Sequence, residues 1–199
     1  MNKRSIRLVS DMILAIAISV SVHQLFEFIF NGFTNLHFSL VLVPLIWLAL
    51  RYGASTAVLA AAMTGLINGL IDFHFSEWVN IILYEILPLL SSGLAGLFAK
   101  YTQKTLNNRR LKSTYLNIST ASILVTLAYF ALKFFIVPMG TGNLTELSIS
   151  KLEFWASFAL MAVVTAVLLC TVAKAMPRWI IPARTKYLTR KETSSLLND

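Results

Sequence analysis

Charged residues are scarce in this sequence. Asp, Glu, Lys and Arg make up 13% of its 199 residues, about half of their share in an ordinary soluble domain. Hydrophobic residues make up 57%, and the mean hydropathy is +0.71. A globular core of this size cannot bury so much apolar surface, so the excess must face lipid. The composition therefore excludes a separate soluble domain and predicts an all-α, polytopic membrane protein, with one integral membrane domain over residues 1–199.

Cysteine, metal-ligand patterns and the common catalytic motifs are also missing. The one cysteine, Cys170, lies in the last apolar segment, which excludes a disulfide framework and a thiolate metal site. The three histidines lack ligand spacing, and Asp72 with His74 makes only a weak metal site. There is no glycine-rich phosphate loop, HExxH motif or GxSxG motif. We therefore expect no metal, no cofactor and no nucleotide-hydrolysing machinery in the chain itself, and we favour a protein that is not an enzyme.

Long hydrophobic runs dominate the sequence. They define six segments, at residues 8–30, 38–52, 54–72, 76–99, 115–138 and 148–176. A bilayer core requires about 20 helical residues, so four segments are comfortable spans, whereas the second and third are short. Residues 51–53 join these two, either in a tight helical hairpin or in a partly re-entrant unit. We predict a six-helix bundle that ends in a mobile cytoplasmic tail over residues 185–199.

The distribution of basic residues predicts the orientation. Fifteen of the seventeen Lys and Arg residues precede the first segment, separate the second from the third, fill the fourth connection or follow the last segment. The positive-inside rule makes this side cytoplasmic, so we expect a multi-pass plasma-membrane protein with both termini inside. The pI of about 9.8 then reflects topology and contact with anionic lipid headgroups, and we expect no nucleic-acid binding.

Four ionisable residues lie within the predicted spans, on four different helices: Glu27, Glu85, Lys133 and Glu153. All four fall in the outer half of the membrane, and Glu85 lies about 13 Å from the outer end of its helix at about 1.5 Å per residue. Glu27, Lys133 and Glu153 could snorkel to the headgroups. Glu85 could form a purely structural pair with Lys133. Because a carboxylate at this depth is costly, we interpret Glu85 as part of a polar pocket that is open to the outside. Three carboxylates against one ammonium favour a cationic ligand there.

Aromatic residues accompany these charges. Trp78 lies at the predicted boundary, where interfacial belt residues are common. Tyr84 and Tyr129 lie deeper, where their rings could stack on a ligand ring or face a cation. The candidate substrate-binding residues are Glu85, Tyr84, Tyr129, Lys133, Glu153, Phe154 and Trp155.

Small residues recur at helical spacing. On the first helix, Ala15 and Ser19 are four residues apart, and so are Ala17 and Ser21. Such stripes let helix backbones approach closely in lipid, where packing drives association. Most of them serve packing within the chain, but the stripes on the first helix are also a candidate surface for a partner protein.

Three stretches carry a resemblance to a known family. They are VPLIWLALRYG at 43–53, AAMTGLINGL at 61–70 and SSGLAGLFAK at 91–100, with a looser echo in AMPRWI at 175–180. Over about residues 38–100 the chain resembles the thiamine-specific S component, the substrate-binding membrane subunit of energy-coupling factor (ECF) transporters, as a divergent member. The resemblance implies a six-helix subunit without catalytic activity that binds thiamine from the outside. It also implies work with a transmembrane coupling protein and two cytoplasmic ATPase subunits. The small residues of the first helix that would contact the coupling protein are Ala15, Ala17, Ser19 and Ser21.

The sequence departs from the family pattern in two places. Tyr84 precedes Glu85, whereas the family has the acidic residue first, to hold the aminopyrimidine of thiamine. Glu153, Phe154 and Trp155 occupy the neighbourhood of the family's Tyr–Asn pair on the last helix. One step along a helix rotates a side chain by about 100°, so an S component for another cationic or heteroaromatic vitamin stays open. Two other classes stay open as well: a structural or interaction membrane protein without ligand, and a lipid-acting membrane enzyme with Glu85 or Glu153 as general base.

Overall fold

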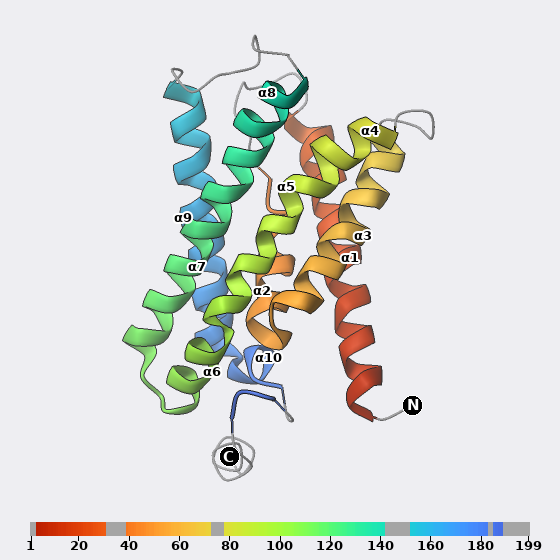
Figure 1. Cartoon of the computed structure of the whole chain (residues 1–199). Helices are drawn as coiled ribbons and strands as arrows, with labels where there is room; N and C mark the ends of the chain where they lie inside the picture. The colour runs from red at the N-terminus through yellow and green to blue at the C-terminus, as the bar shows by residue number, and fades with distance from the viewer. Residues whose placement is uncertain (1–2, 31–38, 73–77, 142–151, 183–184, 189–199) are drawn as a thin grey trace.

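Helices make up the bundle shown in Figure 1, and the described part of the chain contains no strand. In this computed structural model the structure describes residues 3–30, 39–72, 78–141, 152–182 and 185–188. Five of its helices are long and apolar enough to cross a membrane, and a shorter apolar helix joins them. The prediction of an all-α, six-helix membrane bundle is therefore confirmed.

The six predicted segments correspond to six helical columns. The first three are α1 (Lys3–Phe30), α2 (Leu42–Tyr52) and α3 (Ala54–Asp72). The fourth is continuous from Trp78 to Asn107 and consists of α4 (Trp78–Asn80), η1 (Ile81–Ile86), α5 (Leu87–Leu89), η2 (Leu90–Phe98) and α6 (Ala99–Asn107). The fifth consists of α7 (Leu111–Ala131), η3 (Leu132–Ile136) and α8 (Val137–Thr141), and the last of α9 (Leu152–Ala175) followed by α10 (Pro177–Ile180). The predicted third segment has the bounds of α3, whereas the fourth extends further than predicted because polar α6 continues the apolar helix without a break.

The second helix is short and lies inside the bundle. α2 has 11 residues, so it is about 16 Å long at 1.5 Å per residue, roughly half of a bilayer core. Its side chains are buried almost throughout, unlike those of a helix that faces lipid. The other columns surround α2 and expose large apolar residues on their outer faces, such as Phe28 on α1 and Leu59 on α3. This pattern fits a bundle whose rim is solvated by lipid tails.

The connection between α2 and α3 is a tight helical hairpin. Gly53 ends α2 with a φ of 101°, and its amide donates to the carbonyl of Ala49 at 2.8 Å. Only glycine adopts this backbone conformation without strain. On the other side of the turn, a Cβ at Gly96 would collide with the backbone of Ala54, so η2 lies directly against the start of α3. Of the two connections left open by the sequence, the structure has the hairpin.

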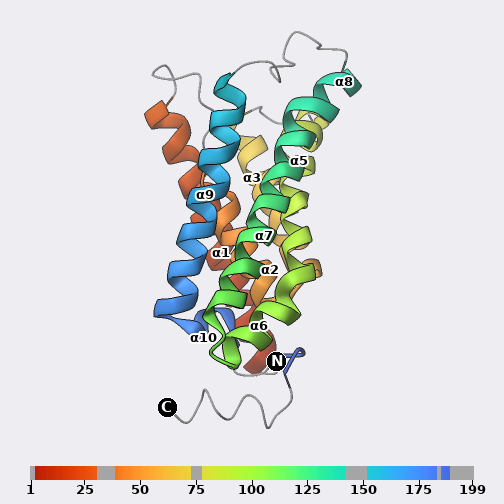
Figure 2. The same ribbon diagram turned by 90° about the vertical axis from the view of Figure 1, so that its left-hand side faces the viewer.

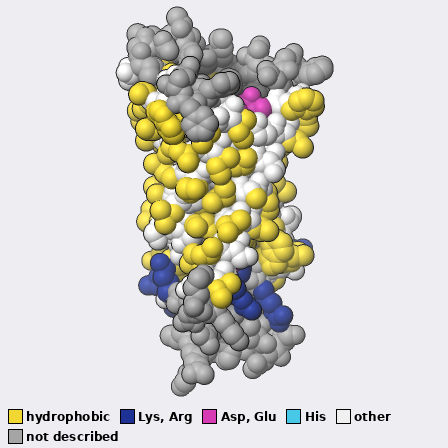
Figure 3. Space-filling view, turned by 90° about the vertical axis from the view of Figure 1, so that its right-hand side faces the viewer, with side chains coloured by type: hydrophobic (Ala, Val, Ile, Leu, Met, Phe, Trp, Pro, Cys, Tyr) yellow, Lys and Arg dark blue, Asp and Glu magenta, His cyan; other side chains and the backbone are white. Residues whose placement is uncertain are grey.

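The two ends of the bundle differ in the charge of their side chains. We call the end that holds the start of α1, the α6–α7 turn and α10 the basic end, because the described Lys and Arg residues other than Lys133 lie there. Figure 3 shows Lys and Arg side chains gathered at this lower end and an acidic side chain near the opposite, far end. Between them lies a broad apolar surface, as expected for a chain that spans a bilayer.

Arg51 ties the basic end together. Its Nε lies 3.0 Å from Oδ2 of Asp11 on α1, and its Nη1 donates to the carbonyls of Arg178 and Trp179 in α10. The indole Nε1 of Trp47 donates to the same Trp179 carbonyl at 3.0 Å. These bonds satisfy carbonyl groups at a helix end that would otherwise lack partners.

The C-terminal segment also packs at the basic end. Gln103 of α6 donates to the carbonyl of Leu50 at 2.7 Å, and its Oε1 accepts a hydrogen bond from Thr185 at 2.6 Å. Leu188 is buried in the core. Residues 185–188 of the predicted tail are thus docked on the bundle, and residues 189–199 lie outside the described residues.

Candidate functional site

Two π-helical segments place the charges of the candidate site. Glu85 lies in η1 and Lys133 in η3, and each segment interrupts a long column towards the far end. A π-helical turn adds one residue per turn and re-aims the side chains that follow, which is why such turns recur at functional sites.

The small-residue stripe of α3 brings this helix directly against η1. A Cβ at Gly65 would lie 2.7 Å from Cα of Ile86 and 2.9 Å from the carbonyl oxygen of Glu85. A Cβ at Gly69 would likewise press on the side chain of Ile81. The absence of side chains at these two glycines therefore sets the position of the Glu85 backbone.

Glu85, Lys133 and Tyr129 form a compact charged group. Nζ of Lys133 lies 3.5 Å from Oε1 of Glu85 and 5.8 Å from the centre of the Tyr129 ring. Glu85 and Tyr129 are each 7% exposed. The structure thus brings together three of the predicted site residues, from columns four and five. The ion pair that we considered on sequence grounds is present, and the tyrosine ring adds a cation–π contact to its ammonium.

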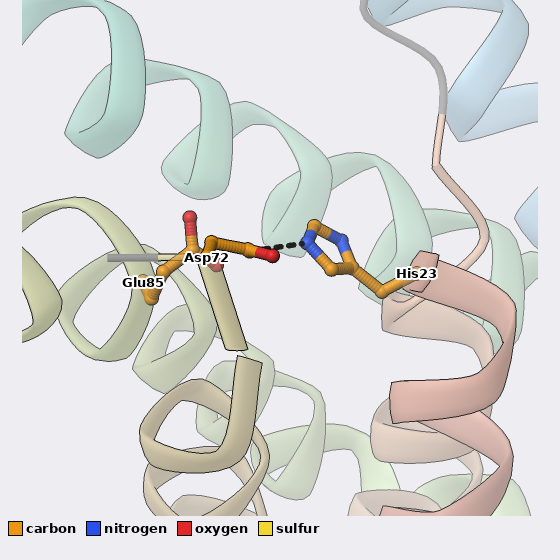
Figure 4. A group of neighbouring side chains, drawn as sticks. All are labelled: His23, Asp72 and Glu85. Atoms are coloured by element: carbon orange, nitrogen blue, oxygen red, sulfur yellow. Dashed lines mark hydrogen bonds and ion pairs between the residues drawn. The ribbon is translucent and has the colours of Figure 1, made fainter. Parts of the chain in front are cut away.

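A second polar group lies beside Glu85 and comes from α1 and α3. Nε2 of His23 lies 3.4 Å from Oδ2 of Asp72, and the Gln24 amide donates to Oδ1 of Asp72 at 3.2 Å. Ligating atoms of His23, Asp72 and Glu85 all lie within 4.8 Å of one another. Figure 4 shows the His23 ring and the Asp72 carboxylate pointing towards each other, with Glu85 next to Asp72.

Negative charge exceeds positive charge in this region. The carboxylates of Asp72 and Glu85 face one ammonium, that of Lys133. Glu27 lies one turn after His23 on α1 and is close enough to act electrostatically on Lys133. With a neutral His23, three carboxylates accompany one ammonium among the described residues. Such a balance favours a ligand that brings its own positive charge.

Polar side chains continue along α3 below Asp72. Asn68 and Thr64 precede Asp72 by one and two helical turns, and both are fully buried. The two polar atoms of the Asn68 amide and the hydroxyl of Thr64 have no hydrogen-bond partner among the described residues. Buried polar groups are normally hydrogen-bonded, so unpaired Asn68 and Thr64 distinguish this face of α3 from ordinary apolar core.

A metal ion fits this constellation poorly. His23, Asp72 and Glu85 offer three ligand atoms, one each, within 4.8 Å of one another. The Lys133 ammonium is 3.5 Å from Glu85, and it would repel a divalent cation bound to the same carboxylate. The carboxylates are better suited to an organic cation that also donates hydrogen bonds to them.

The predicted residues of the last helix lie in a different environment. Phe154 and Trp155 belong to a group of edge-to-face and tilted rings with Phe130, Phe134 and Phe158. Phe130, Phe154, Trp155 and Phe158 of this group line a groove between α7 and α9, which pack side by side (Figure 2). Trp155 is 51% exposed on that surface. The side chain of Glu153 lies outside the described residues.

Tyr84 is half-buried on η1, one residue before Glu85. A step of one residue turns the side chain well away from that of Glu85. Tyr84 thus shares a helical segment with Glu85, but the ring that lies near the Lys133 ammonium is that of Tyr129.

His23, Gln24, Asp72 and Asn68 were missed by sequence reasoning. In the sequence, the three histidines lack ligand spacing, and Asp72 has only His74 as a nearby metal-ligand residue. A usable signal exists on α3, where Thr64, Asn68 and Asp72 recur every four residues in an otherwise apolar helix. That spacing places three polar side chains on one helical face.

The two small-residue stripes of α1 face in different directions. Ala15 and Ser19 are fully buried, and the Ser19 hydroxyl donates to the carbonyl of Val41 at 3.2 Å. Ala17 and Ser21 are exposed. The first stripe therefore packs within the chain, and only the second is accessible from outside the described bundle.

Together, these observations define an integral membrane protein with a cluster of charged and polar side chains between its helices near one end. The family model described as Thiamine transporter protein matches residues 9–137, and the chain belongs to this family. A chain described as ThiT from Listeria monocytogenes has a similar structure, with a TM-score of 0.72 and 21% identity over 91% of this chain and 100% of that chain. No curated protein matches the sequence.

Family membership confirms the resemblance seen in the sequence. The protein is a transporter component and not an enzyme, which removes the lipid-acting enzyme from the open classes. The shared fold extends beyond the residues matched by the family model and includes the last helix.

Proposed function

We propose that this chain is the substrate-capturing S component of an ECF-type vitamin transporter and that it binds thiamine. The observation that carries the proposal is the ion pair between buried Glu85 and partly exposed Lys133, at 3.5 Å, in a site with excess carboxylates. A purely structural ion pair requires no further charge. The additional carboxylate of Asp72, within 4.8 Å of Glu85, instead suits a cationic ligand.

The chemistry of thiamine complements that of the site. Its aminopyrimidine has an exocyclic amine that donates hydrogen bonds and ring nitrogens that accept them. A carboxylate such as Glu85 suits the amine, and the Lys133 ammonium suits a ring nitrogen. Its thiazolium carries a permanent positive charge, which suits the remaining carboxylates and the face of Tyr129.

The other predicted site residues complete the proposed pocket. Phe154 lies 5.8 Å from Phe134, ring centre to ring centre, and Phe134 follows Lys133 in η3. The ring group thus connects α9 to the segment that holds the ammonium. We propose that Tyr84, Glu153, Phe154 and Trp155 border the bound vitamin.

We also propose the orientation and the partners of the subunit. The basic end would face the cytoplasm of a cell whose plasma membrane holds the protein, in line with the positive-inside rule. The site would then open to the outside, with both termini inside. A transmembrane coupling protein would contact the exposed small residues Ala17 and Ser21 on α1. Two cytoplasmic ATPase subunits would supply the energy.

Calorimetric titration of the detergent-purified protein with thiamine tests the proposal. We expect saturable binding by the unaltered chain and a loss of affinity of at least about tenfold in Glu85→Gln, because the neutral amide loses a charge-assisted hydrogen bond. A folded protein that binds no thiamine would refute the thiamine assignment. If another cationic or heteroaromatic vitamin then binds, the S-component function stands with a different substrate; if none binds, a structural role replaces it.

A further inference from the structure

We infer that Asp72 is a second substrate-binding carboxylate, positioned by His23 and Gln24, and that it makes the site select a cationic ligand over a neutral one of the same shape. This inference rests on the proposed function and deepens it. It assigns the recognition of positive charge to a residue of α3 outside the Glu85–Lys133 pair.

The first argument is the way in which Asp72 is held. Both of its carboxylate oxygens accept from α1, Oδ2 at 3.4 Å from His23 Nε2 and Oδ1 at 3.2 Å from the Gln24 amide. A carboxylate has about four acceptor positions, so these two contacts orient the group and leave the others available. The Asp72 side chain is 30% exposed, whereas that of His23 is 7% exposed. A fixed and accessible carboxylate is what a ligand-binding group requires.

The second argument is electrostatic. Asp72 is the last residue of α3, and the C-terminal end of a helix carries a partial negative charge that disfavours an acidic side chain. A second carboxylate, that of Glu85, lies within 4.8 Å. The Lys133 ammonium is engaged with Glu85 at 3.5 Å and with the Tyr129 ring.

The carboxylates of Asp72 and Glu85 and the C-terminal end of α3 therefore place negative charge in one region. Among the described residues, the Lys133 ammonium is the one that lies beside them. The imidazole of His23 can offset this only when it is protonated. A ligand cation that enters between Asp72 and Glu85 relieves the repulsion at every pH at which both are ionised. A neutral ligand of the same shape gains nothing from Asp72.

The experiment compares two probes that differ only in charge. One is thiamine, and the other is its neutral isostere in which carbon replaces the thiazolium nitrogen. The affinity of each is measured by calorimetry for the unaltered chain and for Asp72→Asn, which keeps the size and an acceptor for Gln24. Asp11→Asn is the matched control, because it removes the same charge at the basic end, where Asp11 pairs with Arg51.

We expect the unaltered chain and Asp11→Asn to prefer thiamine to its neutral isostere. In Asp72→Asn this preference falls by about tenfold or more, through weaker thiamine binding with little change for the isostere. If Asp72→Asn does not fold, Asp72→Ser has the same expected result. An unchanged preference, or an equal loss for both probes, would overturn the role of Asp72 while the proposed function stands. If the unaltered chain binds neither probe, the proposed binding of thiamine fails and the inference fails with it.

A third variant tests how Asp72 is positioned. His23→Gln keeps a neutral donor towards Asp72, so we expect it to retain the preference for thiamine from pH 5 to 8. If the preference is lost in this variant as in Asp72→Asn, a protonated His23 and not the Asp72 carboxylate determines charge selection, and the inference is wrong.

Discussion

The excess of carboxylates around Lys133 predicts that the two partners of the buried ion pair contribute unequally to stability. Lys133→Met removes the ammonium and leaves Glu85, which is 7% exposed, within 4.8 Å of Asp72, with the exposed Glu27 as a third carboxylate in the region. Glu85→Gln leaves Lys133 with these two carboxylates still present. The loss of the cation is therefore the more destabilising change in the protein without ligand.

The magnitude follows from the geometry. At an N–O distance of 3.5 Å and an effective dielectric constant of about 20, the gross attraction between the charges is about 5 kcal/mol. A quarter of the Lys133 side chain is exposed, at 25%, so solvent screening reduces the expected net loss to about 2–3 kcal/mol. For Glu85→Gln we expect about 1 kcal/mol, because the amide keeps a hydrogen-bond acceptor for Lys133.

The assay is thermal unfolding of the purified protein in detergent, at one fixed scan rate because membrane proteins often unfold irreversibly. For a chain of this length, each kcal/mol lowers the melting temperature by about 2–4 °C. We therefore expect the melting temperature to fall by about 5–10 °C in Lys133→Met and by about 2–4 °C in Glu85→Gln. Lys112→Met is the control, since Lys112 is exposed near the start of the same column; we expect a change within about 0.5 kcal/mol. An equal or larger loss in Glu85→Gln would refute the reasoning that the site carries excess negative charge.

Two further predictions concern backbone position and partner contact. Gly65→Leu places a side chain where a Cβ would lie 2.7 Å from the Ile86 backbone, so we expect η1 to shift and thiamine affinity in calorimetry to fall by about tenfold or more. Gly140→Leu, where a Cβ would meet nothing within 4 Å, is the control, and equal losses would contradict this role of Gly65. Ala15→Leu overpacks a fully buried position and should lower the melting temperature by an amount equivalent to about 1–3 kcal/mol. Ala17→Leu, on the exposed face, should leave melting and thiamine affinity unchanged but reduce thiamine uptake by cells; normal uptake would remove this face from the proposed partner surface.

Much of the fold could be predicted from the sequence, because the hydrophobic pattern reports directly on what lipid accepts. The third segment was predicted with the bounds 54–72, and α3 is Ala54–Asp72. Residues 51–53 were predicted as the connection between the second and third segments, but the sequence left a hairpin and a re-entrant unit open, and the φ of 101° at Gly53 belongs to the hairpin of the structure. What the pattern could not decide was whether α2 spans or inserts, because length and hydropathy are similar for a buried helix and a short span.

The candidate site could be predicted only in part. Glu85 and Lys133 were found because each charge is conspicuous in an apolar run, and the positive-inside rule gave both a similar depth. His23 and Asp72 are 49 residues apart and meet only through the packing of α1 on α3. Phe154 and Trp155 were predicted to line the substrate site, but nothing in the sequence showed that their rings line a groove between α7 and α9.

By itself, then, the sequence determined the membrane class, the six helical columns and the level at which the buried charges lie. These properties depend on the transfer of each side chain between water and lipid, which is a local property of the chain. Only the tertiary structure decided which carboxylates converge, that Ala15 and Ser19 face inward while Ala17 and Ser21 face outward, and that π-helical turns carry Glu85 and Lys133. These depend on the rotation of each helix about its own axis. Hydropathy leaves this rotation nearly undetermined when apolar residues surround the helix on all sides. Close packing between helices, as at Gly65 and Gly96, then fixes it.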